Sequence, residues 1–161
     1  MMRDLQFIDS DLFGPLKEKA LALPRLRTNH NFHESDDDNP HRFLNVMARG
    51  TYVSPHRHLQ PPKSETFLVL EGRAGILLFD DAGKVVQAEV LDGTKRLGVD
   101  LAPGVWHTLV VLTPFVVIFE VKPGPWVISS DKGFPAWAPR EGDPGAGTYL
   151  DWLRQQLPDA N

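Results

Sequence analysis

About eight short apolar segments fill the middle of this 161-residue chain, and this pattern constrains the fold more than any other feature. Each segment is rich in valine, leucine, isoleucine and phenylalanine, and glycine, proline or aspartate separates it from the next. Such spacing is typical of a β-sandwich or barrel. The segments are residues 43–49, 51–57, 66–71, 74–80, 84–91, 96–102, 106–112 and 115–122. We therefore predict an all-β core that shows no helical periodicity.

Helices are expected only at the two ends of the chain. Residues 14–24 contain good helix formers, although Pro15 is tolerable only in a first helical turn. Near the C-terminus, Asp143 is a suitable N-cap, and Pro144 suits the first helical position. The apolar residues that follow fall on one helix face, which predicts a docking face. They are Ala146, Tyr149, Leu150, Leu153 and Leu157.

Length and composition indicate one globular domain over residues 1–161. It divides into an N-terminal helix and extended segment (1–42), the β core (43–122), and a C-terminal loop and helix (123–161). A net charge of −4 argues against nucleic-acid binding, which favours a basic surface. No apolar run approaches a membrane span, and the first residues lack the apolar stretch of a signal peptide. We expect a cytoplasmic protein without a membrane partner.

Four side chains in the β core have the chemistry of a metal site. His56 and His58 are two residues apart, so a strand places both on one face. Glu65 opens the next strand, and His107 follows a glycine-containing turn much later. The chain has no cysteine, so a metal must use histidine, carboxylate or carbonyl groups. Three imidazoles and one carboxylate suit one divalent ion of Zn, Fe, Mn, Ni or Co. Alternatively, these groups bind each other or a sugar without a metal.

The spacing of these residues resembles the two sequence motifs of the cupin superfamily. Gly50-x5-His56-x-His58 and Glu65-x6-Gly72 resemble the first motif, and Gly104-x2-His107 resembles the second. The gap between His58 and Glu65 is longer than is usual in the family. The resemblance implies a double-stranded β-helix, or jelly roll, with the four residues as ligands of a metal inside the barrel mouth.

Longer segments are similar to the WbuC-type cupin-fold metalloproteins. They are "PRLRTNHNFH", "HRHLQPPKSETFLVLEG", "APGVWHTLV" and "DKGFPAWAPREGDP" with the later "YLDWL". This similarity covers nearly the whole chain. It implies a role near lipopolysaccharide O-antigen or surface polysaccharide biosynthesis, but no settled reaction.

A run of alternating polar residues near the N-terminus is the candidate substrate-binding surface. If the segment is extended, its polar side chains share one face. They are Arg25, Arg27, Asn29, Asn31 and His33. Arginine forks bind carboxylate or phosphate, and burial of unpaired guanidinium groups is costly. We therefore predict that this face points toward the metal and binds an anionic or sugar-like molecule. The alternative is a solvated edge strand or a strand between subunits.

Two functions remain open from the sequence. The first is a metalloenzyme that acts on a small polar molecule, as an isomerase, an epimerase or an oxygenase. The second is a non-catalytic binding or sensor protein whose metal anchors a ligand. A proton-moving pocket residue distinct from the four metal ligands would favour the enzyme, and His33 and Tyr52 are the candidates. Because exposed sheet edges need covering, we also expect a homodimer that includes the N-terminal segment.

Overall fold

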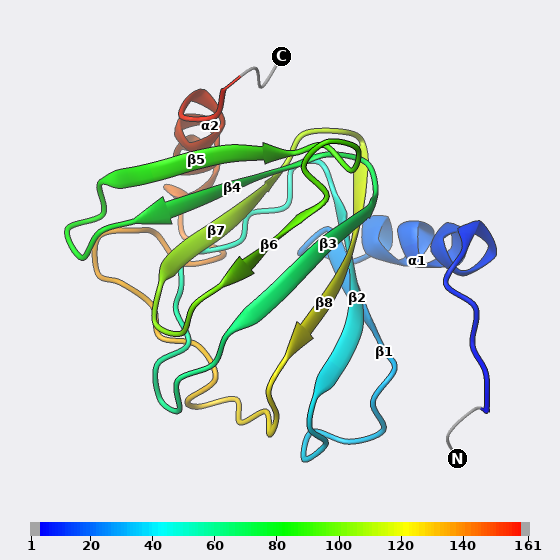
Figure 1. The fold of residues 1–161 in the computed structure, drawn as a ribbon. Coiled ribbons are helices and arrows are strands. Elements are labelled where there is room, and N and C mark those ends of the chain that lie inside the picture. The colour runs from blue at the N-terminus through cyan, green and yellow to red at the C-terminus, as the bar shows by residue number, and fades with distance from the viewer. Residues whose placement is uncertain (1–3, 159–161) are drawn as a thin grey trace.

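The computed structural model describes residues 4–158 and shows two antiparallel β-sheets packed face to face (Figure 1). The five-stranded sheet has the order β1 (Arg27–Asn31), β2 (His41–Ala48), β8 (Phe115–Lys122), β3 (Glu65–Glu71) and β6 (Gly98–Leu101). The three-stranded sheet has the order β5 (Val85–Leu91), β4 (Ala74–Phe79) and β7 (Trp106–Val111). The predicted all-β jelly roll with short terminal helices is confirmed.

The main core lies between the two sheets. Alternate residues of each strand point inward, so apolar side chains from both sheets meet in the middle. Those at most 1% exposed are Met47, Ala74, Leu91, Val111, Val116 and Ile118. Burying one large apolar side chain stabilises a protein by roughly 1.5–3 kcal/mol. The core therefore holds the two sheets in the positions that frame the site below.

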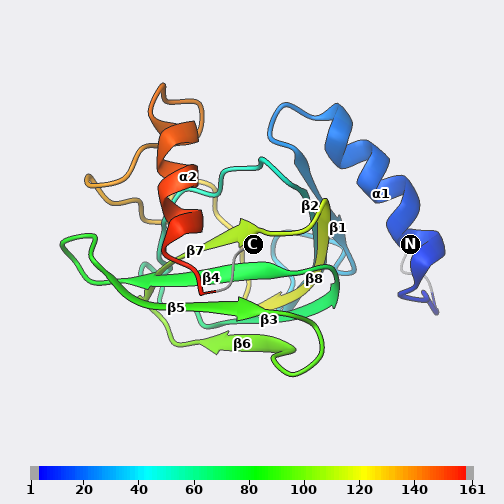
Figure 2. The same ribbon diagram turned by 90° about the horizontal axis from the view of Figure 1, so that it is seen from above.

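Helix α1 (Ser10–Ala22) covers the outer face of the five-stranded sheet beside β1 and β2 (Figure 2). It begins four residues before the predicted start, because the carboxylate of Asp9 accepts backbone hydrogen bonds and caps it. Pro15 consequently lies beyond the first turn of the helix, although we expected it within the first turn. The apolar face of the helix packs against Leu44 and Val46.

Helix α2 (Ala146–Gln155) packs on the outer face of the three-stranded sheet, and its predicted docking face is confirmed. The predicted cap is wrong, because Gly145 occupies the N-cap position. The carboxylate of Asp143 instead accepts a hydrogen bond from the backbone N–H of Arg140 at 2.7 Å. That side chain therefore closes the turn before the helix.

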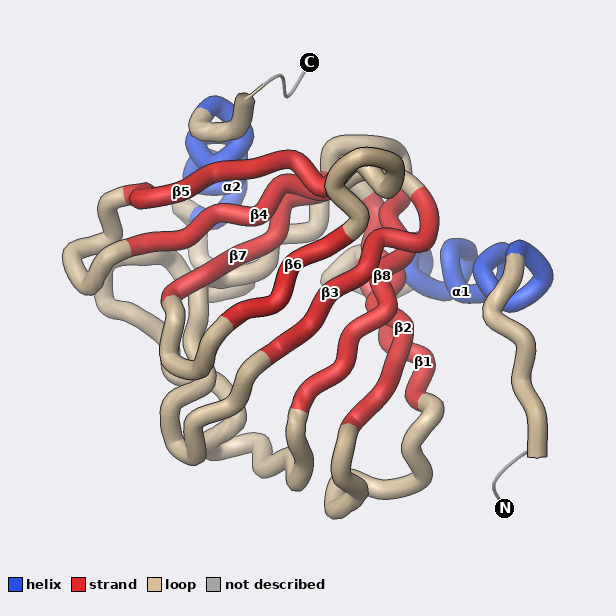
Figure 3. Tube along the Cα trace, viewed as in Figure 1, coloured by secondary structure: helices blue, strands red, loops and turns tan. Residues whose placement is uncertain are grey.

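Residues 27–31 form the edge strand that the sequence left as an alternative, and residues 51–57 depart from the predicted strand. The edge strand, β1, is in register with β2. Residues 51–57 pair only through isolated bridges, which join His56 to His107 and Arg57 to Gly133. The loop at 123–145 thus contacts the segment at 49–64 through the bridge between Arg57 and Gly133, and Figure 3 draws both segments as loop. Among residues 4–158, no helix has the length and apolar character needed to cross a bilayer.

Candidate metal centre

The structure brings the four predicted metal ligands together. One ligand atom from each of His56, His58, Glu65 and His107 lies within 4.8 Å of the others. All four side chains are buried, with exposed fractions between 2% and 6%. They come from the 51–64 segment, the start of β3 and the start of β7. The predicted constellation is therefore a compact, buried group with the composition of a mononuclear metal site.

Backbone pairing fixes these ligands relative to one another. His56 and His107 exchange two backbone hydrogen bonds of 3.0 Å each, so their strands are locked side by side. The carbonyl of His58 accepts a hydrogen bond from the N–H of Gly104, in the turn that leads to β7. Gly104 has φ of 78°, a conformation that favours glycine. The glycine of the second motif is thus required by the turn that presents His107.

Each histidine of the group uses its Nδ1 atom to bind a backbone carbonyl. The acceptors are Ser54 for His56 (2.9 Å), Asp131 for His58, and Val105 for His107 (2.9 Å). A carbonyl can only accept, so Nδ1 carries the proton in all three rings. Every Nε2 atom is then left with a free lone pair, the tautomer that a metal ligand needs.

No hydrogen bond joins the Nε2 atoms of His58 and His107 to the carboxylate of Glu65, because neither side carries a proton. His58 Nε2 lies 3.1 Å from Glu65 Oε1, and His107 Nε2 lies 2.9 Å from Glu65 Oε2. Nevertheless His58 Nε2, His107 Nε2 and Glu65 Oε2 are buried without a hydrogen-bond partner. Leaving such atoms unsatisfied costs about 1–3 kcal/mol each. A divalent cation among the converging lone pairs would satisfy all of them, so the residues present fit the metal that the fold implies.

Burial also favours the neutral form of His56. It lowers the pKa of His56 well below its ordinary value, and the nearby positive charge of Lys132 contributes to the same shift. A neutral imidazole is the form that binds a metal, so this environment suits a ligand.

A buried ion cluster around Asp131 lies next to the Nδ1 side of the His58 ring. The carboxylate of Asp131 receives Lys63 Nζ at 3.0 Å and Lys122 Nζ at 3.1 Å, and all three side chains are at most 7% exposed. Burial alone would raise the pKa of Asp131, but Lys122 and Lys63 hold it below its ordinary value. Because the carbonyl of the same residue accepts from His58, this cluster fixes the orientation of a metal ligand.

A buried carboxyl group that the sequence analysis missed lies beside the site. Glu120 is on β8, 6% exposed, and its register partners Phe43 and Phe67 belong to the neighbouring strands β2 and β3. Burial raises the pKa of Glu120 well above its ordinary value, and the negative charge of Glu65 adds to the shift. The signal was present in "FVVIFEVK", where a glutamate shares the inward face with Val116 and Ile118.

Lys132, from the 123–145 loop, is a second charged residue near the site that the sequence analysis missed. Burial lowers the pKa of Lys132, whereas the carboxylates of Glu120 and Glu65 favour its charged form. The positive charge of Lys132 also lowers the pKa of His56, so its ammonium group lies near the candidate metal site. No local pattern in the loop sequence marks this lysine, because only the fold brings it there.

The predicted substrate face is not gathered around the metal. The register of β1 with β2 places Asn29 opposite Asn45, whose Oδ1 atom is buried without a partner, and Asn31 opposite Phe43. Both β1 asparagines are exposed, and two strands, β2 and β8, separate β1 from the strand that carries Glu65. Adjacent strands are about 4.8 Å apart, so this face lies roughly 14 Å across the sheet from β3.

The two arginines of that face have an internal partner. Arg25 Nη2 lies 2.8 Å from Glu141 Oε2, and Arg27 Nη1 also pairs with Glu141. Arg27 further donates to Thr51 Oγ1 at 3.1 Å and to the carbonyl of Tyr52 at 3.2 Å. A carboxylate of the chain thus already supplies the partner that we expected from an anionic ligand.

Both predicted proton-moving residues have structural roles. His33 stacks on His41 with ring centroids 4.1 Å apart, and its Nδ1 atom contacts the backbone of Arg42. Tyr52 donates its hydroxyl to the carbonyl of Pro139 at 2.7 Å, and burial raises its pKa. Both side chains therefore bind backbone atoms, whereas the carboxyl group of Glu120 interacts with the metal-ligand candidate Glu65, so Glu120 becomes the candidate for proton transfer.

The chain belongs to the family described as a domain of unknown function (DUF6016), whose model matches residues 8–91. The matched region contains His56, His58 and Glu65 but ends before His107. A search of the curated proteins found no match to this sequence.

Solved structures show where else this fold occurs. The capsular polysaccharide assembling protein CapF from Staphylococcus aureus is 21% identical with a TM-score of 0.59, over 70% of this chain and 32% of CapF. The L-ribose isomerase of Cellulomonas parahominis is 14% identical with a TM-score of 0.54, over 70% of each chain. A cupin 2 domain-containing protein from Halorhodospira halophila is 15% identical with a TM-score of 0.48, over 82% of this chain and 83% of that one. The alignment with CapF spans about a third of that protein's length. The likenesses to CapF and to the L-ribose isomerase show the fold alone, a jelly roll of two antiparallel sheets.

Proposed function

We propose that this protein is a metalloenzyme that isomerises or epimerises a small, sugar-like molecule by moving a proton. The observation that carries the proposal is the position of Glu120, a buried carboxyl group beside the four metal ligands. A buried carboxyl that serves only stability is unusual, because its desolvation is costly unless a partner compensates it. A group placed to exchange a proton with a bound molecule explains its retention.

The four ligand residues and Glu120 have different tasks in this proposal. His56, His58, Glu65 and His107 hold the ion, which would polarise a carbonyl or hydroxyl oxygen of the substrate. Glu120 gives or takes a proton at its carboxyl oxygens, and burial, which raises its pKa well above the ordinary value, favours the protonated form. Lys132 neutralises the negative charge that remains when the proton leaves Glu120.

The biological setting in surface polysaccharide synthesis is supported by resemblance. The chain is similar to the WbuC-type proteins over the segments quoted above, and these proteins are associated with O-antigen synthesis. Two fold neighbours carry names from carbohydrate chemistry, a capsular polysaccharide assembling protein and an L-ribose isomerase. We therefore propose a sugar or nucleotide sugar as the substrate class.

The test combines metal analysis with hydrogen exchange. Protein purified without a metal-affinity tag is analysed for bound metals and then incubated in D2O with a panel of aldoses, ketoses and nucleotide sugars. NMR follows deuterium incorporation at substrate carbons, which a proton-transfer enzyme catalyses. General acid–base groups contribute about 10²–10⁴-fold, so Glu120→Gln should reduce exchange by about that factor without loss of metal.

The matched control is Glu71→Gln, which changes a half-exposed carboxylate that pairs with Lys17 on the protein surface. It should leave exchange and metal content unchanged. A sugar that binds to the metal-loaded protein without any exchange would instead support the non-catalytic binding protein. Equal exchange in wild type and Glu120→Gln would remove Glu120 from the mechanism.

A further inference from the structure

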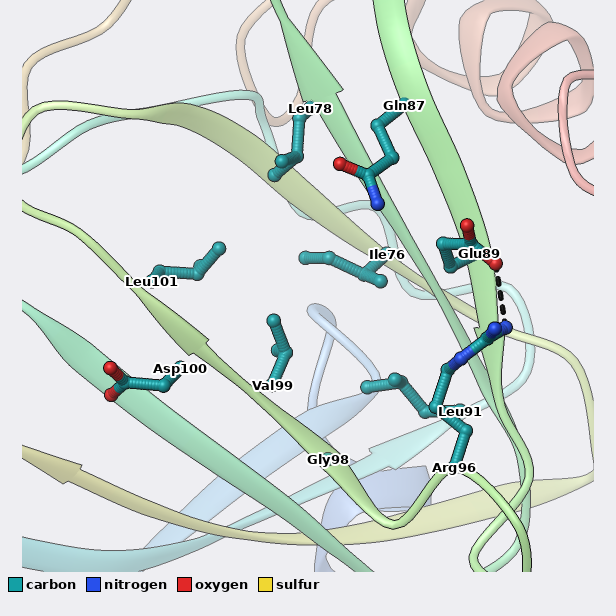
Figure 4. Close-up of a pocket in the computed structure, with 10 residues that line it drawn as sticks. All are labelled: Ile76, Leu78, Gln87, Glu89, Leu91, Arg96, Gly98, Val99, Asp100 and Leu101. Atoms are coloured by element: carbon teal, nitrogen blue, oxygen red, sulfur yellow. Dashed lines mark hydrogen bonds and ion pairs between the residues drawn. The ribbon is translucent and has the colours of Figure 1, made fainter.

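We propose that the space between the edge strands β5 and β6 is a second binding site, for a small amphipathic molecule. Its apolar group lies inside the sandwich toward the metal centre, and an uncharged polar head remains at the rim. Figure 4 shows this pocket, which has a volume of about 390 Å³. Pockets of roughly 300–1,000 Å³ hold small molecules. The residues that line the pocket support this second site independently of the reaction proposed above.

The pocket exists because polar residues occupy inward positions of an edge strand. Gln87 pairs in register with Leu78, and Glu89 pairs with Ile76, so each shares the inner sheet face with an apolar partner. A glutamine and a glutamate cannot fill an apolar interior, since their head groups need water or a polar partner. Gln87 is exposed, and Glu89 pairs with Arg96 at 2.6 Å across the rim (Figure 4).

The interior of the pocket is apolar and only partly filled. Ile76, Leu78, Val99 and Leu101 point toward one another from β4 and β6 in Figure 4. Leu78 and Val99 are only half-buried, although they pack against the core cluster. An apolar group that covers the open apolar surface inside a concave site is stabilised there by the hydrophobic effect.

The inner end of the pocket adjoins the candidate metal site. Leu78 is the register partner of His107, and Leu101 is the register partner of Glu65. Directly paired residues on one face of an antiparallel sheet have Cβ atoms about 4.5–5.5 Å apart. An apolar group between these leucines therefore lies beside two metal ligands, and it approaches them from the side of the β5 and β6 edges.

The rim selects the head group by charge. It carries one guanidinium, Arg96, and one carboxylate, Glu89, and these two groups pair with each other. The carboxylate of Asp100 points away from the pocket and accepts a hydrogen bond from Thr66 at 2.7 Å (Figure 4). No unpaired charge is left for an ionic head, so an uncharged head is favoured at this rim.

The experiment uses 1-hexanol, hexylamine and hexanoate as probes of the full-length protein with methyl-labelled Ile, Leu and Val. Hexanol should shift the methyl signals of Ile76, Leu78 and Val99, with NOEs from the terminal probe methyl to Leu78 or Leu101, and hexylamine should bind at least several-fold more weakly. Hexanoate should likewise bind at least several-fold more weakly. Absence of these shifts at millimolar probe, or tighter binding of hexanoate or hexylamine, would overturn the proposal.

Three variants locate the binding. Val99→Phe fills the pocket, and Gln87→Trp covers its opening from an exposed position that does not threaten folding. Each should weaken hexanol binding at least tenfold. The matched control is Val86→Trp, on the opposite face of the same strand and 60% exposed, which should bind hexanol as wild type does. Equal affinity in Gln87→Trp and Val86→Trp would refute the site. Metal content is measured in parallel, so a failure of the metal centre is recognised separately.

Discussion

The ring of His58 donates a hydrogen bond through Nδ1 to the backbone carbonyl of Asp131, although 73 positions separate the two residues. The side chain of Asp131 is meanwhile held by Lys63 and Lys122. One residue thus joins a metal ligand, the long connection before β3 and the end of β8. This relationship gives the unusually long gap between His58 and Glu65 a structural purpose.

Asp131→Ala should therefore impair both stability and metal binding. It leaves two buried lysines without their carboxylate, a change that typically costs about 3–5 kcal/mol. Removing a group that orients a metal ligand typically weakens metal affinity about 10–100-fold. Urea unfolding and competition with a metal chelator measure the two effects. Asp151→Ala is the control, since its pair with Arg154 is exposed and should contribute less than about 1 kcal/mol. Wild-type affinity in Asp131→Ala would show that the cluster does not orient His58.

The metal ligands themselves give the most direct prediction. We expect about one divalent ion per chain, and His56→Ala and His107→Ala should each reduce occupancy strongly, because each removes one of only four ligands. Inductively coupled plasma mass spectrometry of protein purified without a metal-affinity tag measures the content. His33→Ala should retain the metal, since His33 is outside the group. Full retention in the His56→Ala, His107→Ala double variant would contradict the assignment.

The ion pair of Arg27 with Glu141 should make stability depend on pH. Burial alone would raise the pKa of Glu141, but its hydrogen bonds with Arg27 and Arg25 hold it below the ordinary value. A carboxyl whose pKa is lower in the folded state stabilises the protein above its unfolded pKa, near 4.3, and loses that effect as the pH falls through the folded pKa. Glu141→Gln should thus cost about 1 kcal/mol at pH 7, since solvent screens this exposed carboxylate, and progressively less below about pH 4.

Urea unfolding of wild type and Glu141→Gln at pH 7, 4 and 3 measures this dependence. Asp151→Asn provides a control carboxylate whose side chain is 69% exposed. A stability difference for Glu141→Gln that stays constant over this pH range would show that the charge of Glu141 does not act in the pair.

The part of the site that could be predicted is the part that local periodicity encodes. His56 and His58 share a face because they are two residues apart in extended chain, and the turn at Gly104 marks His107. The sandwich follows from the apolar segments in the same way, although the 51–57 segment forms only isolated bridges and the strand predicted at 96–102 is reduced to Gly98–Leu101.

The rest depends on contacts between distant residues. Arg25 meets Glu141 across 116 positions, so no local pattern could show that the two arginines already had a partner. Lys132 and Asp131 reach the site from a loop whose path the sequence does not determine. Glu120 was the exception, because alternation along β8 marks it as an inward-facing carboxyl. A charged residue that alternates with core positions was thus a better indicator of the site than the alternating polar residues near the N-terminus.

The N-terminal segment leads to a prediction about assembly. Leu5, Phe7 and Ile8 are 69%, 71% and 45% exposed, and β1 is an edge strand of the larger sheet. Apolar side chains and an open edge both favour contact with another surface, so we expect a twofold homodimer that buries this segment. Light scattering should give the dimer mass at concentrations well above micromolar. Combined Leu5→Ser and Phe7→Ser changes should shift the mass toward the monomer, whereas Ile128→Ser, at an 81% exposed position in the 123–145 loop, should not. A monomer mass for the wild type would end this interpretation, and the exposed segment would then need another partner.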